Sequence, residues 1–434
     1  MSRKINGKTW LGVLFVPVLA LGLSAACKSA PVAADSAIDA GAGAGGPATG
    51  NTASGYRVLA PIQSGDLTLF PVVRADGKAG EGAVFLTLDE GLRSGEVEVT
   101  EAGNARGLVR SRGGRQPVYQ GDQVNTLVLI NHSKRPLVLL AGEIVTGGKQ
   151  DRIVASDRIV PNDSDPVDLN VFCVEHGRWT ETSNKFGAAA NAPAKSFMVQ
   201  PEVRRQAMVA KDQQQVWNAV GGAISGMAQA AAPVATQTPH SGSASNTVVT
   251  NNSNVEMNSE MITMLPSTGR NLGTTSYAKT MAMDAVAQKV DAAAPELTRA
   301  REQVLVQLKQ ENAIGVVVAV HGQIIWADLF ADNELLARYW VKLVRSYAAE
   351  GLTTVGGHRA EATVAQAQRF LDTPMHGEEK SQGDVGVYRT LESQAGTTDQ
   401  FVLESLLPGL REEVHVSRVK VYRPAGVQPV GMLQ

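Results

Sequence analysis

The sequence has little cysteine and none of the common metal motifs. Its only two cysteines are Cys27 and Cys173, and it lacks a His-Glu-x-x-His motif, a paired Cys-x-x-Cys motif and an aspartate-rich calcium loop. The usual signatures of zinc and calcium sites are therefore missing, and we expect no metal and no cofactor. A Gly-x-Ser-x-Gly motif is also absent, which argues against a serine hydrolase.

Neither sign of charge is in excess. The chain has 40 Lys and Arg residues against 42 Asp and Glu residues. Nucleic-acid binding depends on clustered positive charge, so this balance gives no reason to expect a nucleic-acid partner. The apolar content is ordinary for a soluble globular protein, and the length allows two domains or one large one.

A strongly apolar run stands at the N-terminus. Basic residues precede residues 10–23, and small residues lead from there to Cys27. This order is typical of an export signal, and it resembles a bacterial lipoprotein signal, in which Cys27 becomes the lipidated first residue. We expect a signal peptide over residues 1–26 and a protein attached to the membrane by its N-terminal lipid. Its location would be extracytoplasmic in a bacterial cell envelope, periplasmic or at the outer membrane.

Two alternatives remain open for this segment. Ordinary signal-peptidase cleavage after Ala26 would release the protein, and an uncleaved run would anchor it, although the run is short for a membrane span. An acylated Cys27 leaves Cys173 without an internal disulfide partner. Because Cys173 lies within an apolar run, we expect a buried, inert thiol there rather than a nucleophile.

Two segments have compositions that cannot bury a core. Residues 27–55 are rich in Ala, Gly, Pro and Ser, and we interpret them as a disordered tether. Residues 233–276 form a polar insertion without periodicity, which we also expect to be disordered. Residues 56–232 and 277–434 would then be the two parts of one domain.

Short apolar runs predict strands in the first part of this domain. The candidates are residues 67–70, 84–88, 95–100, 153–160 and 167–174. Residues 124–130 and 136–140 flank a polar cluster, and together they predict a hairpin.

Helical periodicity follows from Pro201. Apolar residues recur at helical spacing at Val216, Val220, Ile224 and Met227. This helix should end by residue 233, and a second helical region should span residues 277–312 with a break near Pro295.

The last part of the domain mixes helices and strands. A His321-Gly322 pair between two apolar runs predicts a tight hairpin, and Asp332 or Asn333 should then cap an amphipathic helix that Gly351 ends. A helix over residues 359–371 and strands over residues 401–406 and 414–422, with a bulge near residues 417–418, complete the pattern. Since regular β-α-β alternation is absent, we predict an α+β fold, a largely antiparallel sheet with packed helices.

Residues 141–179 place charged side chains and glycines at the ends of apolar strands. The stretch is not a P-loop, because five residues rather than four separate Gly142 from Gly148, and Gln150 lacks the hydroxyl used for magnesium. The glycines would still let backbone amides approach an anion, with Lys149 and Arg152 adding positive charge. A tight turn with a solvated charge cluster is the alternative interpretation.

Glu175 is the second notable position in this stretch. It shares a strand face with Val171 and Cys173, so its carboxylate should be partly buried and should need a cationic partner such as Arg178. It would be either an acid/base or ligand-binding carboxylate with a shifted pKa, or half of a structural ion pair. Trp179 could stack on a planar ligand or simply pack. The candidate ligand-binding residues are Lys149, Gln150, Asp151, Arg152, Arg178 and Trp179, and the candidate catalytic residues are Glu175 and Glu143.

These residues carry a resemblance to a known family. Gly142-Glu143, residues 148–152 and residues 173–179 are similar to blocks of the uncharacterised domain family associated with ADP-ribosylglycohydrolases and rhodanese-phosphatases. Val216-Trp217 and the apolar hairpin after Gly315 fit later blocks of the same family. The resemblance covers roughly residues 56–370. It implies at most a link to ADP-ribose or nucleotide-derived metabolism.

Three functions from different classes remain open. The leading hypothesis is a lipid-anchored extracytoplasmic protein that binds a small anionic ligand, related to a nucleotide or ADP-ribose. The second is a hydrolase of a nucleotide or ADP-ribosyl bond with Glu175 or Glu143 as acid/base. The third is a structural envelope protein whose charge cluster only holds the sheet together.

Overall fold

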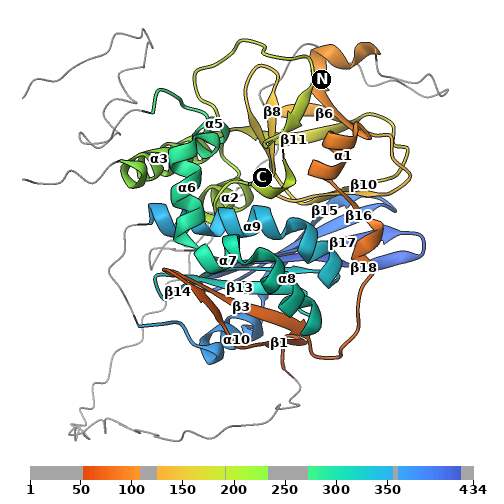
Figure 1. The fold of residues 1–434 in the computed structure, drawn as a ribbon. Coiled ribbons are helices and arrows are strands. Elements are labelled where there is room, and N and C mark those ends of the chain that lie inside the picture. The colour runs from red at the N-terminus through yellow and green to blue at the C-terminus, as the bar shows by residue number, and fades with distance from the viewer. Residues whose placement is uncertain (1–51, 108–124, 191, 233–271, 355–359, 422–434) are drawn as a thin grey trace, which may run out of the picture. The chain divides into compact units, whose positions relative to one another are not determined.

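The computed structural model describes residues 52–107, 125–190, 192–232, 272–354 and 360–421 (Figure 1). The chain divides into the units Met1–Gly50 and Asn51–Gln434, and every described residue belongs to the second. The expected signal peptide, Cys27, residues 27–51 of the tether and residues 233–271 of the insertion lie outside the described residues.

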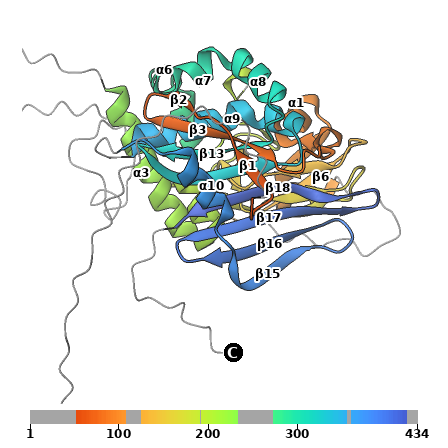
Figure 2. The same ribbon diagram turned by 90° about the horizontal axis from the view of Figure 1, so that it is seen from below.

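The described part has an α+β fold, as the sequence predicts, and its largest sheet has nine strands. The order is β1-β3-β13-β14-β18-β17-β16-β15, with β2 also paired to β3, and every neighbouring pair is antiparallel. Figure 2 shows β15 to β18 side by side at one end of this sheet. The strands are β1 (Tyr56–Val58), β2 (Ile62–Ser64), β3 (Leu67–Arg74), β13 (Gly315–Val320), β14 (Gln323–Phe330), β15 (His376–Asp384), β16 (Tyr388–Ala395), β17 (Thr398–Leu407) and β18 (Leu410–Lys420).

Two smaller sheets carry the stretch singled out in the sequence. One has the order β10-β7-β4 and the other β12-β8-β9-β11-β6-β5, and only the β4–β7 pair is parallel among the described pairs. Their strands are β4 (Leu86–Thr87), β5 (Val97–Glu101), β6 (Thr126–Asn131), β7 (Leu137–Leu139), β8 (Ile144–Gly147), β9 (Arg152–Val154), β10 (Arg158–Val160), β11 (Val167–Cys173) and β12 (Phe186–Ala188).

The helices pack against these sheets. They are α1 (Leu88–Ser94), α2 (Pro201–Arg205), α3 (Gln213–Ala231), α5 (Tyr277–Ala282), α6 (Asp284–Ala293), α7 (Pro295–Arg299), α8 (Arg301–Gln310), α9 (Asn333–Thr353) and α10 (Val364–Asp372). Shorter turns are η1 (Gly82–Val84), η2 (Ala102–Gly107), η3 (Pro193–Lys195) and the π-helical turn η4 (Gln206–Ala210). In the described ranges, none of these helices is long and apolar enough to cross a membrane.

Helix α9 is the central helix of the described unit. It packs on β3, β13 and β14 of the large sheet and also contacts α3, α6 and α7. Its predicted apolar face is buried, and the polar side chains Lys342, Arg345 and Ser346 are buried as well. A helix buried on nearly all sides must provide partners for such polar groups, so the position of α9 decides where the internal ion pairs lie.

Several predictions about turns, helix caps and helix ends are confirmed. His321 and Gly322 both have positive φ, 48° and 76°, and they join β13 to β14 in the expected tight hairpin. Asp332 caps α9, since its Oδ1 accepts a hydrogen bond of 2.8 Å from the Leu335 N–H. The helical region 277–312 is broken where Pro295 begins α7, and α3 ends at Ala231.

The predicted hairpin over residues 124–140 is wrong. Strand β6 pairs with β5 and β11, whereas β7 pairs with β4 and β10 in another sheet. The polar cluster between them folds on itself, because the Asn131 side-chain amide donates to the carbonyls of Arg135 (2.8 Å) and Pro161 (2.9 Å). These bonds turn the chain out of one sheet and into the next.

Several element boundaries also differ from expectation. Residues 153–160 form two strands rather than one, and residues 84–88 contain only the two-residue β4, because Thr87 and Glu90 form a capping box that starts α1. Helix α9 continues past Gly351 to Thr353, since one glycine lowers helix stability by only about 1 kcal/mol. The expected bulge near residues 417–418 instead falls opposite Leu403/Glu404.

The outer limits of the two expected disordered segments also lie in folded structure. The Ser54 N–H and hydroxyl both bind Asp372 Oδ1, at 3.0 and 2.6 Å. Ser276, placed in the insertion by composition alone, is fully buried at the start of α5. Residues 52–55 and 272–276 therefore belong to the folded unit.

Candidate functional site

Antiparallel pairing of β9 with β11 brings the two ends of the predicted stretch together. Cys173 pairs with Arg152, so the residues just beyond each strand, Asp151 and Glu175, become neighbours. The Asp151 N–H donates to Glu175 Oε2 at 3.2 Å, and the Gln150 side-chain amide donates to the Glu175 carbonyl at 3.0 Å. The sheet therefore places three of the predicted site residues in direct contact.

The Glu175 carboxylate is buried and held by two cations. Its Oε2 lies 2.6 Å from Arg178 Nη2, and its Oε1 lies 2.8 Å from Lys279 Nζ on α5. Burial by itself would raise the pKa of Glu175, but the hydrogen bonds from Arg178 and Lys279 outweigh it and lower that pKa below its usual range. Glu175 is therefore a charged, fully paired carboxylate at neutral pH.

Asp151 is the second buried carboxylate of this cluster. Its Oδ2 accepts a hydrogen bond of 2.6 Å from the Ser276 hydroxyl, and its Oδ1 accepts one of 3.2 Å from the Gly147 N–H. Burial raises the pKa of Asp151, and the negative charge of Glu175 adds to this effect, while the bond from Ser276 opposes it. Arg178 Nη2 lies 3.6 Å from Asp151 Oδ1, so this guanidinium bridges both carboxylates.

The glycine turn before Lys149 is held by hydrogen bonds within the protein. Gly147 and Gly148 have φ of 125° and 49°, and Arg178 Nη1 donates to the Gly148 carbonyl at 3.0 Å. The Gly147 and Gly148 amides donate to the side chains of Asp151 and Ser183. The expectation that these amides would face an anion therefore has no support in the geometry of the turn.

Trp179 forms the solvent-facing edge of the site. Its side chain is 46% exposed, and Lys149 Nζ lies 5.2 Å from the centroid of its ring. The guanidinium carbon of Arg152 lies 5.9 Å from the same centroid, although Arg152 itself is fully buried. Burial lowers the pKa of Arg152, an effect that Cys173 and then Glu101 oppose. The indole thus lies between a buried cation and solvent.

Glu143 does not belong to this cluster. Its fully buried carboxylate contacts Lys342 Nζ of α9 and accepts a hydrogen bond of 2.8 Å from the Leu140 N–H. Lys342 Nζ also lies 3.1 Å from Asp89 Oδ1 of α1. Burial raises the pKa of Glu143, and the charge of Lys342 opposes the rise. The two candidate catalytic carboxylates, Glu143 and Glu175, therefore lie in separate ion-pair clusters.

Cys173 is buried at the end of β11, in line with an inert thiol. Its Sγ donates to the Glu175 carbonyl at 3.3 Å, and burial raises the pKa of the thiol. The neighbouring His176 packs edge-on against Trp217 of α3, with ring centroids 4.6 Å apart. The His176 ring therefore packs against α3 through this aromatic contact.

Lys279 and Ser276 are site residues that the sequence analysis missed. Ser276 Oγ caps α5 by accepting the Lys279 N–H at 3.0 Å, and the same hydroxyl binds Asp151. A serine before a helix is a recognisable cap signal. That signal gives no information on which distant carboxylate the helix will meet, so the contact with Asp151 was not predictable.

No group of three or more His, Cys, Asp or Glu side chains that could hold a metal occurs in the described ranges.

The fold and this site define an α+β protein with a charged, tryptophan-edged cluster beyond β9 and β11. A model of the ARG and Rhodanese-Phosphatase-superfamily-associated Protein domain matches residues 55–419. The chain belongs to this family, and the resemblance seen in the sequence is confirmed and extends through the C-terminal strands. Neither a curated protein nor a solved structure matches the chain.

Proposed function

We propose that this protein binds a small anionic ligand with a planar part at the Trp179 patch, the surface formed by Lys149, Arg178, Trp179 and Lys279. The observation that carries the proposal is the 46% exposed indole of Trp179, with Lys149 Nζ 5.2 Å from its ring centroid. Exposed tryptophans beside cations suit planar anions, because the ring stacks while the cations bind the charge.

The ion pairs of Arg178 and Lys279 support binding because they hold the patch in a fixed arrangement. Arg178 and Lys279 neutralise the Glu175 and Asp151 carboxylates, and the Lys279 side chain is still 56% exposed. The indole is therefore presented by a pre-arranged cluster of ion pairs, which reduces the ordering needed on binding. Since the family description names an association with the ARG and rhodanese-phosphatase superfamilies, ADP-ribose and nucleotides are the first ligands to test.

Binding is favoured over acid/base catalysis by the state of Glu175. A general acid works best when its pKa lies near the working pH, and the two cations hold the pKa of Glu175 low. Glu143 cannot assist it, because its carboxylate is paired with Lys342 in another cluster. The hydrolase alternative would require Glu175→Gln to abolish turnover while ligand affinity and thermal stability remain.

A thermal-shift screen of the full chain with ADP-ribose, NAD, nucleotides and sugar phosphates tests the proposal. A ligand at 100 times its Kd stabilises the folded state by about 2.7 kcal/mol. We expect a hit that Trp179→Ala and Lys149→Ala each weaken at least tenfold in a titration. The matched control is Lys309→Ala on α8, an exposed lysine outside the patch, which should leave affinity unchanged.

The outcomes separate binding from a purely structural role. If Lys149→Ala lowers the melting temperature strongly and no compound in the panel shifts the wild type, the cluster only holds the strand ends together. If a ligand binds but Trp179→Ala binds it equally well, the site lies elsewhere and the patch is rejected.

We also propose that the protein is attached to the cell envelope through a lipid on Cys27. The support is the sequence order of basic residues, an apolar run and small residues before this cysteine. Metabolic labelling with a radioactive fatty acid should label the wild type and leave Cys27→Ala unlabelled, and only the wild type should fractionate with membranes. Equal labelling of both would reject the anchor.

A further inference from the structure

The six-stranded sheet curls until its two end strands meet. Strand β5 stands at one end of the strand order and β12 at the other, yet the two strands contact each other. The Thr100 hydroxyl of β5 donates a hydrogen bond of 2.9 Å to the Asn184 carbonyl, just before β12. Because β12 also pairs with β8, with Phe186 opposite Gly147, this curl brings the end of β5 to the glycine turn before Lys149.

Glu101, the last residue of β5, lies beside this turn. Its side chain is fully buried, and its Oε1 accepts a hydrogen bond of 2.9 Å from the Lys149 N–H, 48 positions away in the sequence. A Cβ atom added to Gly148 would lie only 2.7 Å from the same oxygen, closer than a Cβ atom packs. The glycine therefore makes room for a carboxylate that fixes the backbone of Lys149.

Glu101 is also the leading carboxylate that acts on Arg152. Burial lowers the pKa of this guanidinium, and Cys173 followed by Glu101 opposes the shift. Burial raises the pKa of the Cys173 thiol, so the thiol is uncharged at neutral pH and Glu101 supplies the largest opposing charge. A buried guanidinium needs such a charge, because an uncompensated cation is strongly unfavourable inside a protein.

Lys149 and Arg152 are the two cations beside the Trp179 ring. Lys149 Nζ lies 5.2 Å from the ring centroid, and the guanidinium carbon of Arg152 lies 5.9 Å from it. Both distances are within the roughly 6 Å at which a cation is attracted to an aromatic face. Glu101 holds the first cation through its backbone and the second through its charge, so the position of the indole depends on this one buried carboxylate.

We infer that Glu101 is the positioning residue of the Trp179 patch, which keeps Trp179 ready to stack on a ligand by holding Lys149 and Arg152 at its ring. The inference rests on the proposed function, which gives the patch its ligand, but the positioning can be measured without one. Glu101→Gln keeps an oxygen for the Lys149 N–H and removes the charge that acts on Arg152. Glu101→Asp keeps the charge, and its shorter side chain withdraws the acceptor from Lys149.

Acrylamide quenching of tryptophan fluorescence in the full chain tests the inference. The Trp179 contribution is the difference between each protein and its Trp179→Phe counterpart. We expect both Glu101 variants to raise the Trp179 quenching constant about twofold, because an indole that leaves its cations can become fully exposed, against 46% in the structure. A compound that binds in the thermal-shift screen should bind each variant at least fivefold more weakly.

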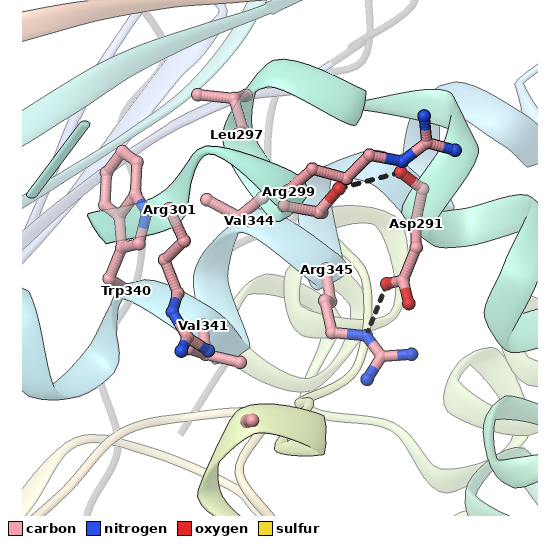
Figure 3. Close-up of a pocket in the computed structure, with 10 residues that line it drawn as sticks. Asp291, Leu297, Arg299, Arg301, Trp340, Val341, Val344 and Arg345 are labelled. Atoms are coloured by element: carbon pink, nitrogen blue, oxygen red, sulfur yellow. Dashed lines mark hydrogen bonds and ion pairs between the residues drawn. The ribbon is translucent and has the colours of Figure 1, made fainter. Parts of the chain in front are cut away.

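Asp291→Asn is the matched control for a merely structural role. Asp291 of α6 is the carboxylate partner of another buried arginine, Arg345 of α9, whose Nε lies 3.2 Å from Asp291 Oδ1. Figure 3 shows this pair in a pocket among the helices. Removing that carboxylate should leave the Trp179 quenching constant and the affinity for ligand as in the wild type.

An unchanged or smaller Trp179 quenching constant in both Glu101 variants would overturn the inference. In that case a lower melting temperature of the variants would assign Glu101 a structural role only. If Glu101→Gln does not fold, Glu101→Asp decides the question alone. If no compound binds the wild type while the Glu101 variants raise the quenching constant, the proposed ligand is rejected and the positioning of Trp179 stands, so the two failures can be told apart.

Discussion

Arg204 of α2 and Asp328 of β14 form a fully buried ion pair in the centre of the described unit. Arg204 Nη1 lies 2.9 Å from Asp328 Oδ2, and Nη2 lies 3.0 Å from Oδ1. The Arg204 Nε donates to the Ala141 carbonyl at 3.2 Å, and the guanidinium carbon lies 4.5 Å from the centroid of the Trp326 ring. One pair thus links the stretch before β8 to the middle of the large sheet through α2.

Breaking this pair from one side should destabilise the fold severely. Asp328→Asn leaves the Arg204 charge buried without its carboxylate, which costs roughly 3–5 kcal/mol of unfolding free energy. Urea denaturation of the variant measures this loss. The double variant Arg204→Met/Asp328→Leu removes both charges and should be less destabilised than Asp328→Asn. A change below about 1 kcal/mol in the single variant would show that the pair is not structural.

His415 should make stability depend on pH above neutrality. It lies between two carboxylates, with Nδ1 2.6 Å from Asp157 Oδ2 and Nε2 3.2 Å from Asp328 Oδ1. Burial lowers the pKa of His415, but the two carboxylates outweigh it and raise the pKa to about 9. Because the folded pKa exceeds the unfolded value of about 6.5, this contribution is complete below pH 6.5 and is lost as the pH rises through about 9.

The size of this effect follows from the shift. A difference of about 2.5 pKa values corresponds to roughly 3 kcal/mol of unfolding free energy, lost between about pH 6.5 and 9. Urea denaturation at pH 6 and pH 10 should show this loss in the wild type, and His415→Gln should show a correspondingly smaller difference. Equal pH dependence in both proteins would mean that His415 is not charged in the folded state.

The Asp151–Glu175 cluster and the Asp328–His415 ion pair differ in how far the sequence alone predicts them. Asp151 and Glu175 lie on one stretch at the ends of two predicted strands, so alternation and pairing bring them together without knowledge of the rest. Asp328 is the only charged residue of β14, and His415 stands between two valines in β18. That pattern signals a buried polar group but names no partner, since a partner across strands depends on the strand order.

Other features left no local signal at all. Strands β15 and β16 lie at one end of the large sheet and are largely polar, so they lack the apolar alternation that marks a strand. Lys342 lies in α9, which is predicted as an amphipathic helix, and its ammonium group contacts Glu143 about 200 positions away in the sequence. The sequence therefore predicts most of the apolar elements and the proximity of Asp151 to Glu175, whereas the tertiary packing adds Ser276 and Lys279 to that cluster and decides that Glu143 lies elsewhere.

Lys342 should be essential for stability, because it neutralises two buried carboxylates. Its ammonium contacts Glu143 Oε1 and lies 3.1 Å from Asp89 Oδ1, and all three side chains are buried. Lys342→Met leaves both carboxylates without this cation, so we expect a loss of roughly 3–5 kcal/mol in urea denaturation. Lys309→Met on the exposed face of α8 is the matched control, with an expected change within about 0.5 kcal/mol. Similar stability of the two variants would contradict this role.

Removing the charge of Glu350, near the end of α9, should stabilise the protein at neutral pH and above, which is the opposite of the effect expected for Lys342. Burial raises the pKa of its carboxyl to about 7, and the nearby charge of Glu202 adds to the rise, although the Glu202 N–H donates to Glu350 Oε2 at 3.1 Å. The nearby cation Arg205 opposes the rise. Because the folded pKa exceeds the usual value of 4.5, the folded state holds the proton longer than the unfolded chain does.

The contribution of Glu350 to the free energy of unfolding should therefore fall as the pH rises from about 4.5 to 7, and it should not recover above pH 7. Glu350→Gln keeps the acceptor oxygen for the Glu202 N–H and removes the titration. We expect this variant to be more stable than the wild type at pH 8, by on the order of 2 kcal/mol, and to match it at pH 4. Thermal unfolding at the two pH values measures both differences. A wild type that is the more stable protein at pH 8 would show that Glu350 carries a favourable charge, paired with Arg205, in the folded state.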